Sequence, residues 1–383
     1  MISAVICEYN PFHNGHYYQL EQMKKESDSV ICIMSGDFVQ RGAAAIYDKF
    51  IRTKAALLSG ADLVIMLPVV YSLSPAELFA FGGVSLCDKL GVVDRLYFGT
   101  ECGDISPLFK AAELLLDEPP QVSGEIKRLL SDGKSYPAAR TAAFSEFIDS
   151  AVLEQPNNIL AIEYIKALIR LNSNIVPIGI KRNSAGHHDF EAHGNIASAS
   201  AIRSLVSEDK AIEALVPDNA FELYKNAEKA DTNSLSSVLM YTLRTKSARE
   251  IAVINEVAEG LENRIKASVY QCADFADISD YIKSKRYTKS KINRILLSVL
   301  LEIDKEMPRK APEYIRVLGM NKKGMKLLSD IKQISQLPVI TKTADYKGFC
   351  DAFEKDIFAS DLYTICRSRP DFGHDFKTSP VIM

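Results

Sequence analysis

The chain has 383 residues, of which 47% are hydrophobic and 25% are charged, and its formal net charge at pH 7 is −3. This length and composition are typical of a globular protein with two or three domains and ordinary apolar cores. The small negative charge excludes a protein that is basic over its whole surface, although it still allows a local basic patch.

Targeting signals and paired cysteines are not evident in the sequence. No run of about 18 apolar residues indicates a transmembrane helix, and the first residues lack the basic and apolar regions of a secretory signal. The seven cysteines are odd in number and show no paired zinc-ligand spacing. We therefore expect a cytoplasmic protein with reduced cysteines, and neither a membrane nor DNA as a partner.

The first two predicted elements flank a turn with two histidines. Ile2 to Cys7 is an apolar run that predicts a buried strand, and Tyr17 to Lys25 predicts a helix. His13 and His16 lie between them, with Gly15 allowing close approach of a ligand. A helix N-terminus binds phosphates readily, and imidazoles there can stabilise developing negative charge. A chance surface pair or an accidental metal site is the alternative, but the surrounding pattern favours a phosphate site.

The same alternation of short apolar runs and amphipathic stretches continues through the first half of the chain. Further strands are expected at Ser29–Met34, Asp62–Leu67, Arg95–Phe98 and Ile175–Ile180, and further helices at Tyr47–Ser59, Ala76–Lys89 and Ile159–Leu171. This spacing is typical of βαβ units, so it predicts an α/β domain with a parallel sheet. Ligands of such sheets bind beyond the carboxyl ends of the strands.

Polar segments follow several predicted strands and should therefore meet at one edge of the sheet. In the turn from Gly36 to Gly42, Asp37 or Gln40 would bind a nucleobase or a small acid, and Arg41 would bind a phosphate. A purely structural turn explains this segment equally well.

Two further strand ends carry candidate ligand contacts. After the fourth strand, Gly99 would let a ribose or an adenine pass close to the backbone, whereas Glu101 could simply be solvated. One of Asn157 and Asn158 should cap the following helix, which leaves the other available for a ligand. Arg182 ends the fifth strand and would lie at the same edge.

A second signature runs from Ile196 to Arg203. Its small hydroxyl residues predict the cap of a helix that begins near Ala199 to Ala201. Arg203 would lie in the first turn and direct its guanidinium at phosphates. Capped helices with an arginine are common, so this segment is informative only together with the histidine turn.

The segment from Gly186 to Asp189, with His193 nearby, could suggest a metal site. Because no second ligand cluster accompanies it, we favour a loop over the site and expect no metal ligands in the protein.

The second half of the chain has a different pattern. Helices are expected at Asn219–Ala227, Ser234–Thr245, Glu250–Ala258, Leu261–Val269 and Lys291–Glu306, and no convincing strand appears after about residue 205. We therefore divide the chain into an α/β domain, residues 1–208, and a mostly helical domain, residues 209–383. The last residues, Arg367 to Met383, resemble an extended tail.

One basic run stands out in the helical half. Tyr287 is interleaved with Lys283, Lys285, Arg286, Lys289, Lys291 and Arg294, and no acidic residue interrupts the run. Such a cluster is compatible with an RNA-backbone patch. A solvated helix face is the usual alternative.

The histidine turn and the Ser-x-Ser-x-Ile-Arg stretch resemble the two signatures of the HIGH nucleotidyltransferase superfamily. More narrowly, the chain resembles the bacterial tRNA(Met) cytidine acetate ligases in its segments Glu8–His16, Ser35–Gly42, Pro156–Leu160 and Lys285–Thr288. The resemblance covers nearly the whole chain in the same order. It implies a Rossmann-like nucleotidyltransferase domain followed by a mostly α-helical domain that binds tRNA.

The resemblance also implies an activity and the residues that carry it. The family activates acetate with ATP to acetyl-adenylate, releases pyrophosphate, and acetylates the wobble cytidine of elongator tRNA(Met) to N4-acetylcytidine. By resemblance the catalytic residues are His13, His16, Ser200 and Arg203, and Mg²⁺ is expected to enter with ATP. The implied ATP site comprises Ile6, Cys7, Glu8, Tyr9, Asn10, Pro11, Phe12, His13, Asn14, Gly15, His16, Tyr17, Tyr18 and Gln19, together with Gly99, Asn157 and Arg182.

Two positions depart from the family pattern. Asp37 replaces an expected Asn, and Ala43 to Ala45 replace a more polar stretch, so the cytidine side of the site is affected more than the ATP side. Two other functions stay open at this point. One is a cofactor adenylyltransferase of the same superfamily, which would leave the helical half unexplained. The other is a non-catalytic, nucleotide-regulated RNA-binding protein.

Overall fold

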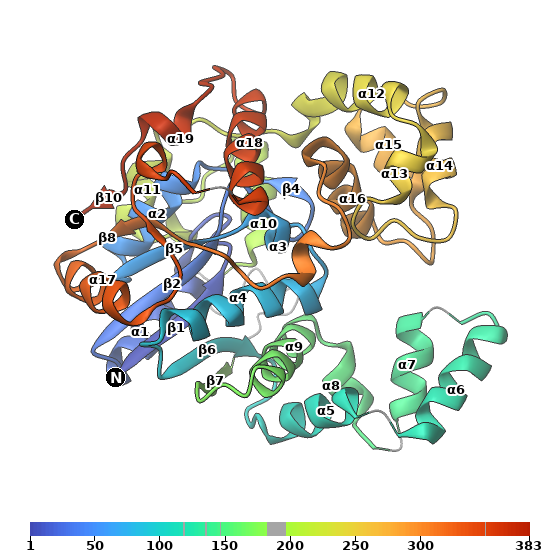
Figure 1. The fold of residues 1–383 in the computed structure, drawn as a ribbon, viewed down its shortest axis with the longest axis horizontal. Coiled ribbons are helices and arrows are strands. Elements are labelled where there is room, and N and C mark those ends of the chain that lie inside the picture. Colours follow the sequence, from blue (N-terminus) through green and yellow to red (C-terminus); the bar gives the residue numbers. More distant parts are fainter. Residues whose placement is uncertain (118, 135, 146, 182–196, 349) are drawn as a thin grey trace.

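One mixed sheet forms the centre of the protein (Figure 1). The computed structural model describes residues 1–117, 119–134, 136–145, 147–181, 197–348 and 350–383. Within these residues, the strand order is β10-β8-β5-β2-β1-β6-β7, with β9 beside β8. The strands are β1 (Ile2–Cys7), β2 (Ser29–Ser35), β5 (Leu63–Leu67), β6 (Arg95–Thr100), β7 (Val176–Lys181), β8 (Ile315–Met320), β9 (Val339–Ile340) and β10 (Val381–Ile382).

The five strands predicted from the first half of the chain are confirmed. β5, β2, β1, β6 and β7 pair in parallel, and each begins and ends within two residues of its predicted limits. Their carboxyl ends consequently lie at one edge of the sheet, where ligands of open α/β sheets bind.

Successive side chains of a strand point to opposite faces of the sheet, and each face packs against an apolar core. On β1, Ala4 and Ile6 pack in one apolar core, whereas Val5 packs in a second core on the other face. Parallel sheets typically have helices on both faces. The first core includes α4 (Ala76–Leu90) and α9 (Pro156–Arg170), and the second includes α1 (Asn14–Glu26), α2 (Lys49–Leu58) and α10 (Ala199–Ser207).

A helical insertion separates β6 from α9. It contains α5 (Ser106–Leu116), α6 (Pro120–Ser131), α7 (Tyr136–Phe144) and α8 (Ser150–Glu154). In Figure 1, α6 and α7 extend away from the sheet, so this insertion adds a lobe beside the edge where the strands end. None of these four helices was predicted from the sequence.

The second half of the chain is mostly helical, as predicted. Its helices are η1 (Glu213–Leu215), α11 (Asp218–Tyr224), η2 (Thr232–Leu235), α12 (Ser236–Thr245), α13 (Ala248–Ala252), α14 (Leu261–Ser268), α15 (Phe275–Ile282), α16 (Lys289–Leu301), η3 (Met307–Arg309), α17 (Lys322–Ile334), η4 (Thr343–Asp345), α18 (Asp351–Ile365) and α19 (His374–Lys377). The helix expected at Glu250–Ala258 is shorter, because the chain leaves it to form a bridge between Ile254 and Asp304. No helix in the described ranges is both long and apolar enough to cross a membrane.

The expectation that no strand follows residue 205 is wrong. β8 is antiparallel to β5, and β10 is parallel to β8, so the end of the chain completes the sheet. All six residues of β8 are buried. A single short apolar run among helices has no periodicity that separates a strand from a buried helix, and its partner lies some 250 residues away. The division at residue 208 stays a prediction, although the sheet takes strands from both parts.

The last residues do not form an extended tail. They include α19 and β10, and Asp375 of α19 is buried against two cations. Its carboxylate lies 2.6 Å from the amine of Lys49 and 2.7 Å from the guanidinium of Arg316, while Asp37 lies 2.6 Å from the same lysine. Burial alone would raise the pKa of Asp375, but Lys49 and Arg316 outweigh this effect and hold the pKa well below its usual value.

Lys49→Met should therefore lower the free energy of unfolding strongly. The substitution leaves two buried carboxylates without the cation that they share, and breaking a buried pair in this way costs about 3–5 kcal/mol. Urea unfolding followed by circular dichroism measures the loss. The matched control is Arg128→Met, which removes exposed ion pairs with Glu125 and Asp132 and should cost less than about 1 kcal/mol. Equal effects of both substitutions would contradict the assigned role of the buried network.

The depressed pKa of Asp375 also predicts how stability depends on pH. Its carboxylate binds a proton more readily in the unfolded chain, so its contribution is complete above about pH 5 and declines as the pH falls below about 4. Asp375→Asn should reduce the slope of unfolding free energy against pH in this acid range. An unchanged slope would show that Asp375 does not carry this contribution.

Candidate functional site

A cavity of about 380 Å³ lies at the carboxyl edge of the parallel sheet. The ends of β1, β6 and β7 contribute to its wall, which is the position predicted for the site. The described residues that line it are Ile6, Cys7, Glu8, Tyr9, Asn10, His13, Gly15, His16, Tyr18, Gln19, Gln40, Arg41, Phe79, Phe98, Gly99, Pro156, Asn157, Leu160, Tyr164, Ile180, Lys181, Ala199 and Arg203.

The two histidines lie at the start of α1. This helix begins at Asn14, three residues earlier than predicted, and His13 is its N-cap. The Nδ1 atom of His13 accepts a hydrogen bond of 3.0 Å from the amide of Gly15. In the neutral ring the proton is therefore on Nε2, which makes that atom a donor. The His16 ring stacks on the ring of His13 at 3.7 Å between centroids. The turn thus presents a fixed imidazole pair beside the positive end of a helix.

Arg203 joins the second sequence signature to the first. Ser198 caps α10 by accepting from the amide of Ala201, which places Arg203 in the first turns of the helix. Its Nη1 donates to the carbonyl of Asn10 at 2.8 Å, and its Nη2 donates to Oγ of Ser200 at 3.0 Å. Ser200 thus orients Arg203 rather than lining the cavity among the described residues. The two motifs, nearly 200 residues apart, meet as predicted.

A buried arginine that the sequence analysis missed holds this loop in place. The side chain of Arg52 on α2 is fully buried and donates to backbone carbonyls at the ends of β1 and β2. The distances are 2.7 Å to Glu8 and 3.0 Å to Ser35, and Gly36 accepts a third bond. A fourth bond of 2.9 Å reaches Tyr47. One feature of the sequence could have indicated this role: Arg52 is a charged residue on the apolar face of an amphipathic helix.

The predicted substrate turn is a small hairpin of β3 (Phe38–Val39) and β4 (Ala43–Ala44). Gln40 and Arg41 at its tip line the cavity. Asp37 is not brought to the cavity wall; it is buried and paired with Lys49, and burial raises its pKa although Lys49 opposes the rise. The structure therefore places Asp37 as a structural anchor of the hairpin.

The polar segment after β6 does not have the arrangement expected from the sequence. Glu101 is not simply solvated, because its carboxylate accepts hydrogen bonds from the backbone amides of Asn157 and Asn158 at the start of α9. A negative charge there satisfies helix N–H groups and the helix dipole. Asn158 in turn accepts from the side chain of Thr100 at 2.8 Å. Only Asn157 of the two lines the cavity, beside Gly99.

The remaining residues predicted for the ATP site do not all lie at the cavity. Phe12 is fully buried and its backbone exchanges two hydrogen bonds with the hydroxyl of Tyr224. Pro11, Asn14 and Tyr17 are not among the described residues that line the cavity. Arg182 lies outside the described residues, as does the loop segment 186–193.

The cavity lining also includes apolar and aromatic side chains that were not predicted as site residues. They are Phe79, Phe98, Leu160, Tyr164 and Ile180. These residues belong to strands and helices whose apolar periodicity predicts core packing equally well. The cavity therefore combines apolar side chains with a few polar groups, among them the histidines and Arg203, as is typical of small-molecule sites.

The predicted basic patch is divided in the structure. Lys283, Lys285, Arg286 and Lys289 are exposed around α15 and α16, and two of them are partly neutralised because Arg286 pairs with Glu259 and Lys289 pairs with Asp280. Arg294 points inward instead.

Arg294 is bound to Glu256 at 2.6 Å and donates to the carbonyl of Gln40 at 3.1 Å. It thus ties α16 to the hairpin tip. Gly42 of the hairpin also touches α16, since a Cβ atom there would lie within 2.6 Å of Asn293 and Arg294.

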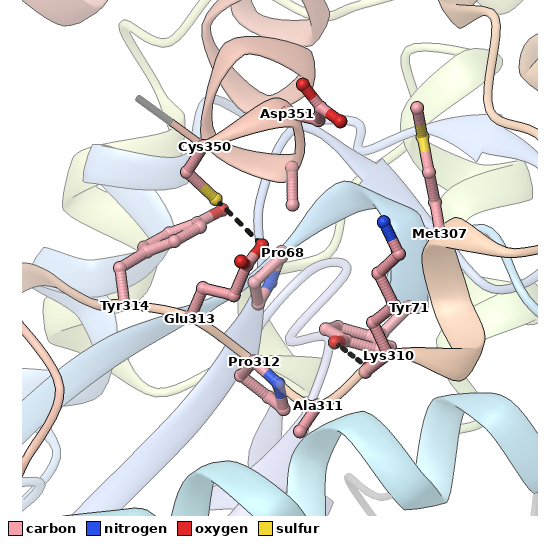
Figure 2. A pocket seen from close by; sticks show the side chains of 11 residues that line it. Pro68, Tyr71, Met307, Lys310, Ala311, Pro312, Glu313, Tyr314, Cys350 and Asp351 are labelled. Carbon is pink, nitrogen blue, oxygen red and sulfur yellow. Dashed lines mark hydrogen bonds between the residues drawn. The ribbon is translucent and has the colours of Figure 1, made fainter. Parts of the chain in front are cut away.

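A second, smaller hollow of about 120 Å³ lies where α18 meets α3 (Val69–Ser72) (Figure 2). In it the thiol of Cys350 donates to Glu313 at 3.2 Å, and the hydroxyl of Tyr71 donates to the carbonyl of Lys310 at 2.6 Å. Burial raises the pKa of Cys350 to about 11, so the thiol stays protonated near neutral pH. These contacts join segments of the fold and suggest no chemistry.

Comparisons with known proteins agree with this geometry. The HIGH Nucleotidyl Transferase family model matches residues 1–375. A relative from Thermoanaerobacter sp. (strain X514), named tRNA(Met) cytidine acetate ligase, is 43% identical over 98% of each chain. A relative of the same name from Acetivibrio thermocellus is 37% identical over 100% of each chain.

Solved structures of one such protein share the fold. Thermotoga maritima TmcAL bound with alpha-thio ATP matches with a TM-score of 0.90 and 31% identity, covering 100% of this chain and 99% of that chain. The apo form of the same protein matches with a TM-score of 0.92 and 32% identity over the same shares. Together with the histidine turn and Arg203 at one cavity, these matches mean that the chain belongs to the tRNA(Met) cytidine acetate ligase family of HIGH nucleotidyl transferases.

Proposed function

We propose that this protein activates acetate with ATP to acetyl-adenylate, with release of pyrophosphate, and transfers the acetyl group to the wobble cytidine of elongator tRNA(Met) to form N4-acetylcytidine. The observation that carries the proposal is the meeting of His13, His16 and Arg203 at one cavity. The relatives of the same name over the whole chain support it.

In the first half-reaction, an acetate oxygen attacks the α-phosphorus of ATP and pyrophosphate leaves. Such a reaction requires little covalent chemistry from the protein, so positioning and charge stabilisation dominate. The Nε2–H group of His13, the ring of His16 and the N-terminus of α1 would stabilise the phosphate oxygens as charge develops. Arg203 is held by Asn10 and Ser200 and would neutralise charge on the same phosphates.

The residues that line the cavity suggest how ATP is oriented. The aromatic rings of Phe98 and Tyr164 would contact the adenine, and Gly99 and Asn157 would also lie near it. The phosphates would then lie at the histidine turn, with Arg41 and Gln40 above it and Arg182 as a further predicted contact. Mg²⁺ would be held mainly by phosphate oxygens and water, because the described residues contain no group of three acidic, His or Cys side chains that could hold a metal. A tRNA substrate implies that the protein works in the cytoplasm.

Pyrophosphate release from ATP tests the proposal directly. Release should require acetate, and total tRNA with labelled acetate should yield labelled N4-acetylcytidine at the wobble position of elongator tRNA(Met). Release that depends on a phosphorylated cofactor precursor would indicate a cofactor adenylyltransferase. The absence of any release would indicate a non-catalytic, nucleotide-regulated RNA-binding protein.

His16→Ala should abolish acetyl-adenylate formation while tRNA still binds. The imidazole acts on the phosphates in the transition state, so its loss should lower the rate by about 100-fold or more. Acetate-dependent exchange of pyrophosphate into ATP measures the first step, and a filter-binding assay measures tRNA affinity. Glu21→Ala on the exposed side of α1 is the matched control and should leave both unchanged. Normal adenylation by the His16 variant would contradict the proposed role.

Replacing Lys283, Lys285, Arg286 and Lys289 with glutamine should weaken tRNA binding and reduce its salt dependence. Each lost phosphate contact should reduce the slope of log affinity against log salt by about 0.7–0.9. Because Arg286 and Lys289 form ion pairs, Lys283 and Lys285 should account for most of the change. Lys326→Gln with Lys332→Gln on α17, on the other side of the molecule in Figure 1, is the control. Unchanged binding across a salt series would identify the run as a solvated surface.

A further inference from the structure

Glu8 is the only acidic side chain among the described residues that line the cavity. The other charged side chains there, Arg41, Lys181 and Arg203, are cationic and suit an anionic ligand. A carboxylate in the same space weakens the attraction of these cations for phosphates. Phosphate binding therefore does not explain Glu8, and a partner that carries N–H groups explains it better.

Two hydrogen bonds, one to its backbone and one to its side chain, hold Glu8 in position. Its carbonyl accepts a bond of 2.7 Å from Arg52, which is buried in the core, and its Oε1 accepts a bond of 2.7 Å from the amide of Gln40 at the hairpin tip. Glu8 directly follows β1 and precedes Tyr9, whose backbone is in the left-handed region with φ 47°. The carboxylate is thus a positioned group and not a solvated side chain.

The surroundings of Glu8 strengthen it as a proton acceptor. Burial raises the pKa of its carboxyl, and this effect outweighs the opposing influence of the Gln40 amide and of the charges on Arg203, Arg41 and Arg52. Arg203 lies on α10, Arg41 at the hairpin tip and Arg52 on α2. Each of these elements therefore contributes one cation near Glu8. A carboxylate with a raised pKa takes a proton more readily from an attacking group.

The second half-reaction needs such an acceptor. The exocyclic amine of cytidine carries two hydrogens, and one of them must leave when the amine becomes an amide. His13 is a donor at Nε2 because its Nδ1 accepts from Gly15, and the guanidinium groups that line the cavity have no acceptor atom. A carboxylate also recognises the N4 amine of cytosine by accepting its hydrogen bond.

We propose that Glu8 receives the exocyclic amine of the acceptor cytidine and removes its proton during acetyl transfer, an inference that rests on the proposed function. The nitrogen lone pair forms a C–N bond with the acetyl carbonyl carbon, and the C–O bond to the adenylate breaks with its electron pair leaving on AMP. The amine proton passes to the Glu8 carboxylate. The same cavity thereby separates two tasks, with His13 and His16 serving the phosphate and Glu8 serving the amine.

Glu8→Gln tests the inference because it retains an oxygen that can accept from Gln40 but cannot take a proton. Acetate-dependent pyrophosphate exchange and trapping of acetyl-adenylate by hydroxylamine report the first half-reaction. Single-turnover formation of N4-acetylcytidine in tRNA reports the second. Transfer should fall by about 100-fold or more, the usual contribution of a general base, while exchange and trapping fall by less than about 10-fold.

A pH profile separates a proton acceptor from a merely structural group. The wild-type transfer rate should rise with pH below the pKa of Glu8, and the Glu8→Gln variant should lose this dependence. Glu21→Gln, an exposed carboxylate on α1, is the matched control, and thermal unfolding verifies that Glu8→Gln is folded.

Three results would contradict the inference: an equal loss of both half-reactions, which would assign Glu8 to ATP; unchanged transfer; or a retained pH dependence in the variant. Wild-type protein that makes no acetyl-adenylate would instead overturn the proposed function itself.

Discussion

The geometry of the nucleotide cavity depends on one buried side chain, the guanidinium of Arg52. Arg52 brings a positive charge into the core, and such a charge is tolerated only when its N–H groups are fully bonded. Its partners are the carbonyls of Glu8, Ser35, Gly36 and Tyr47, which lie where β1 and β2 end and where α2 approaches. The direction in which the chain leaves both strands is thereby set. The histidine turn, the Glu8 carboxylate and the hairpin all follow from these strand ends.

Around this centre, distant parts of the chain each hold one edge of the cavity. Arg203 on α10 binds the carbonyl of Asn10, and Arg294 on α16 binds the carbonyl of Gln40. Asp375 near the C-terminus shares Lys49 with Asp37 at the base of the hairpin. Charge-assisted bonds of this kind are strong where water is excluded. The helical half therefore supports the geometry of the nucleotide site.

Much of the fold was predictable, because its signals are local. Apolar runs of four to six residues separated by amphipathic helices indicated the parallel sheet, and the histidine turn with its following helix suggested a phosphate site. The prediction failed where the deciding partner is remote. β8 has no distinguishing pattern and becomes a strand because β5 offers it an edge. Asp37 was a candidate ligand contact and Glu101 a candidate solvated residue, yet Lys49 binds Asp37 and the start of α9 binds Glu101.

The amino-acid pattern alone indicated the five parallel strands of the first half, the two motifs with His13, His16 and Arg203, and the family resemblance. These features depend on residue type and spacing within short stretches of chain. Three other features become visible only in the folded chain: the C-terminal residues complete the sheet, Arg52 organises the strand ends, and Glu8 is the single acid on the described cavity wall. Burial and charge pairing arise between residues far apart in the chain, so their consequences appear only once the chain is folded.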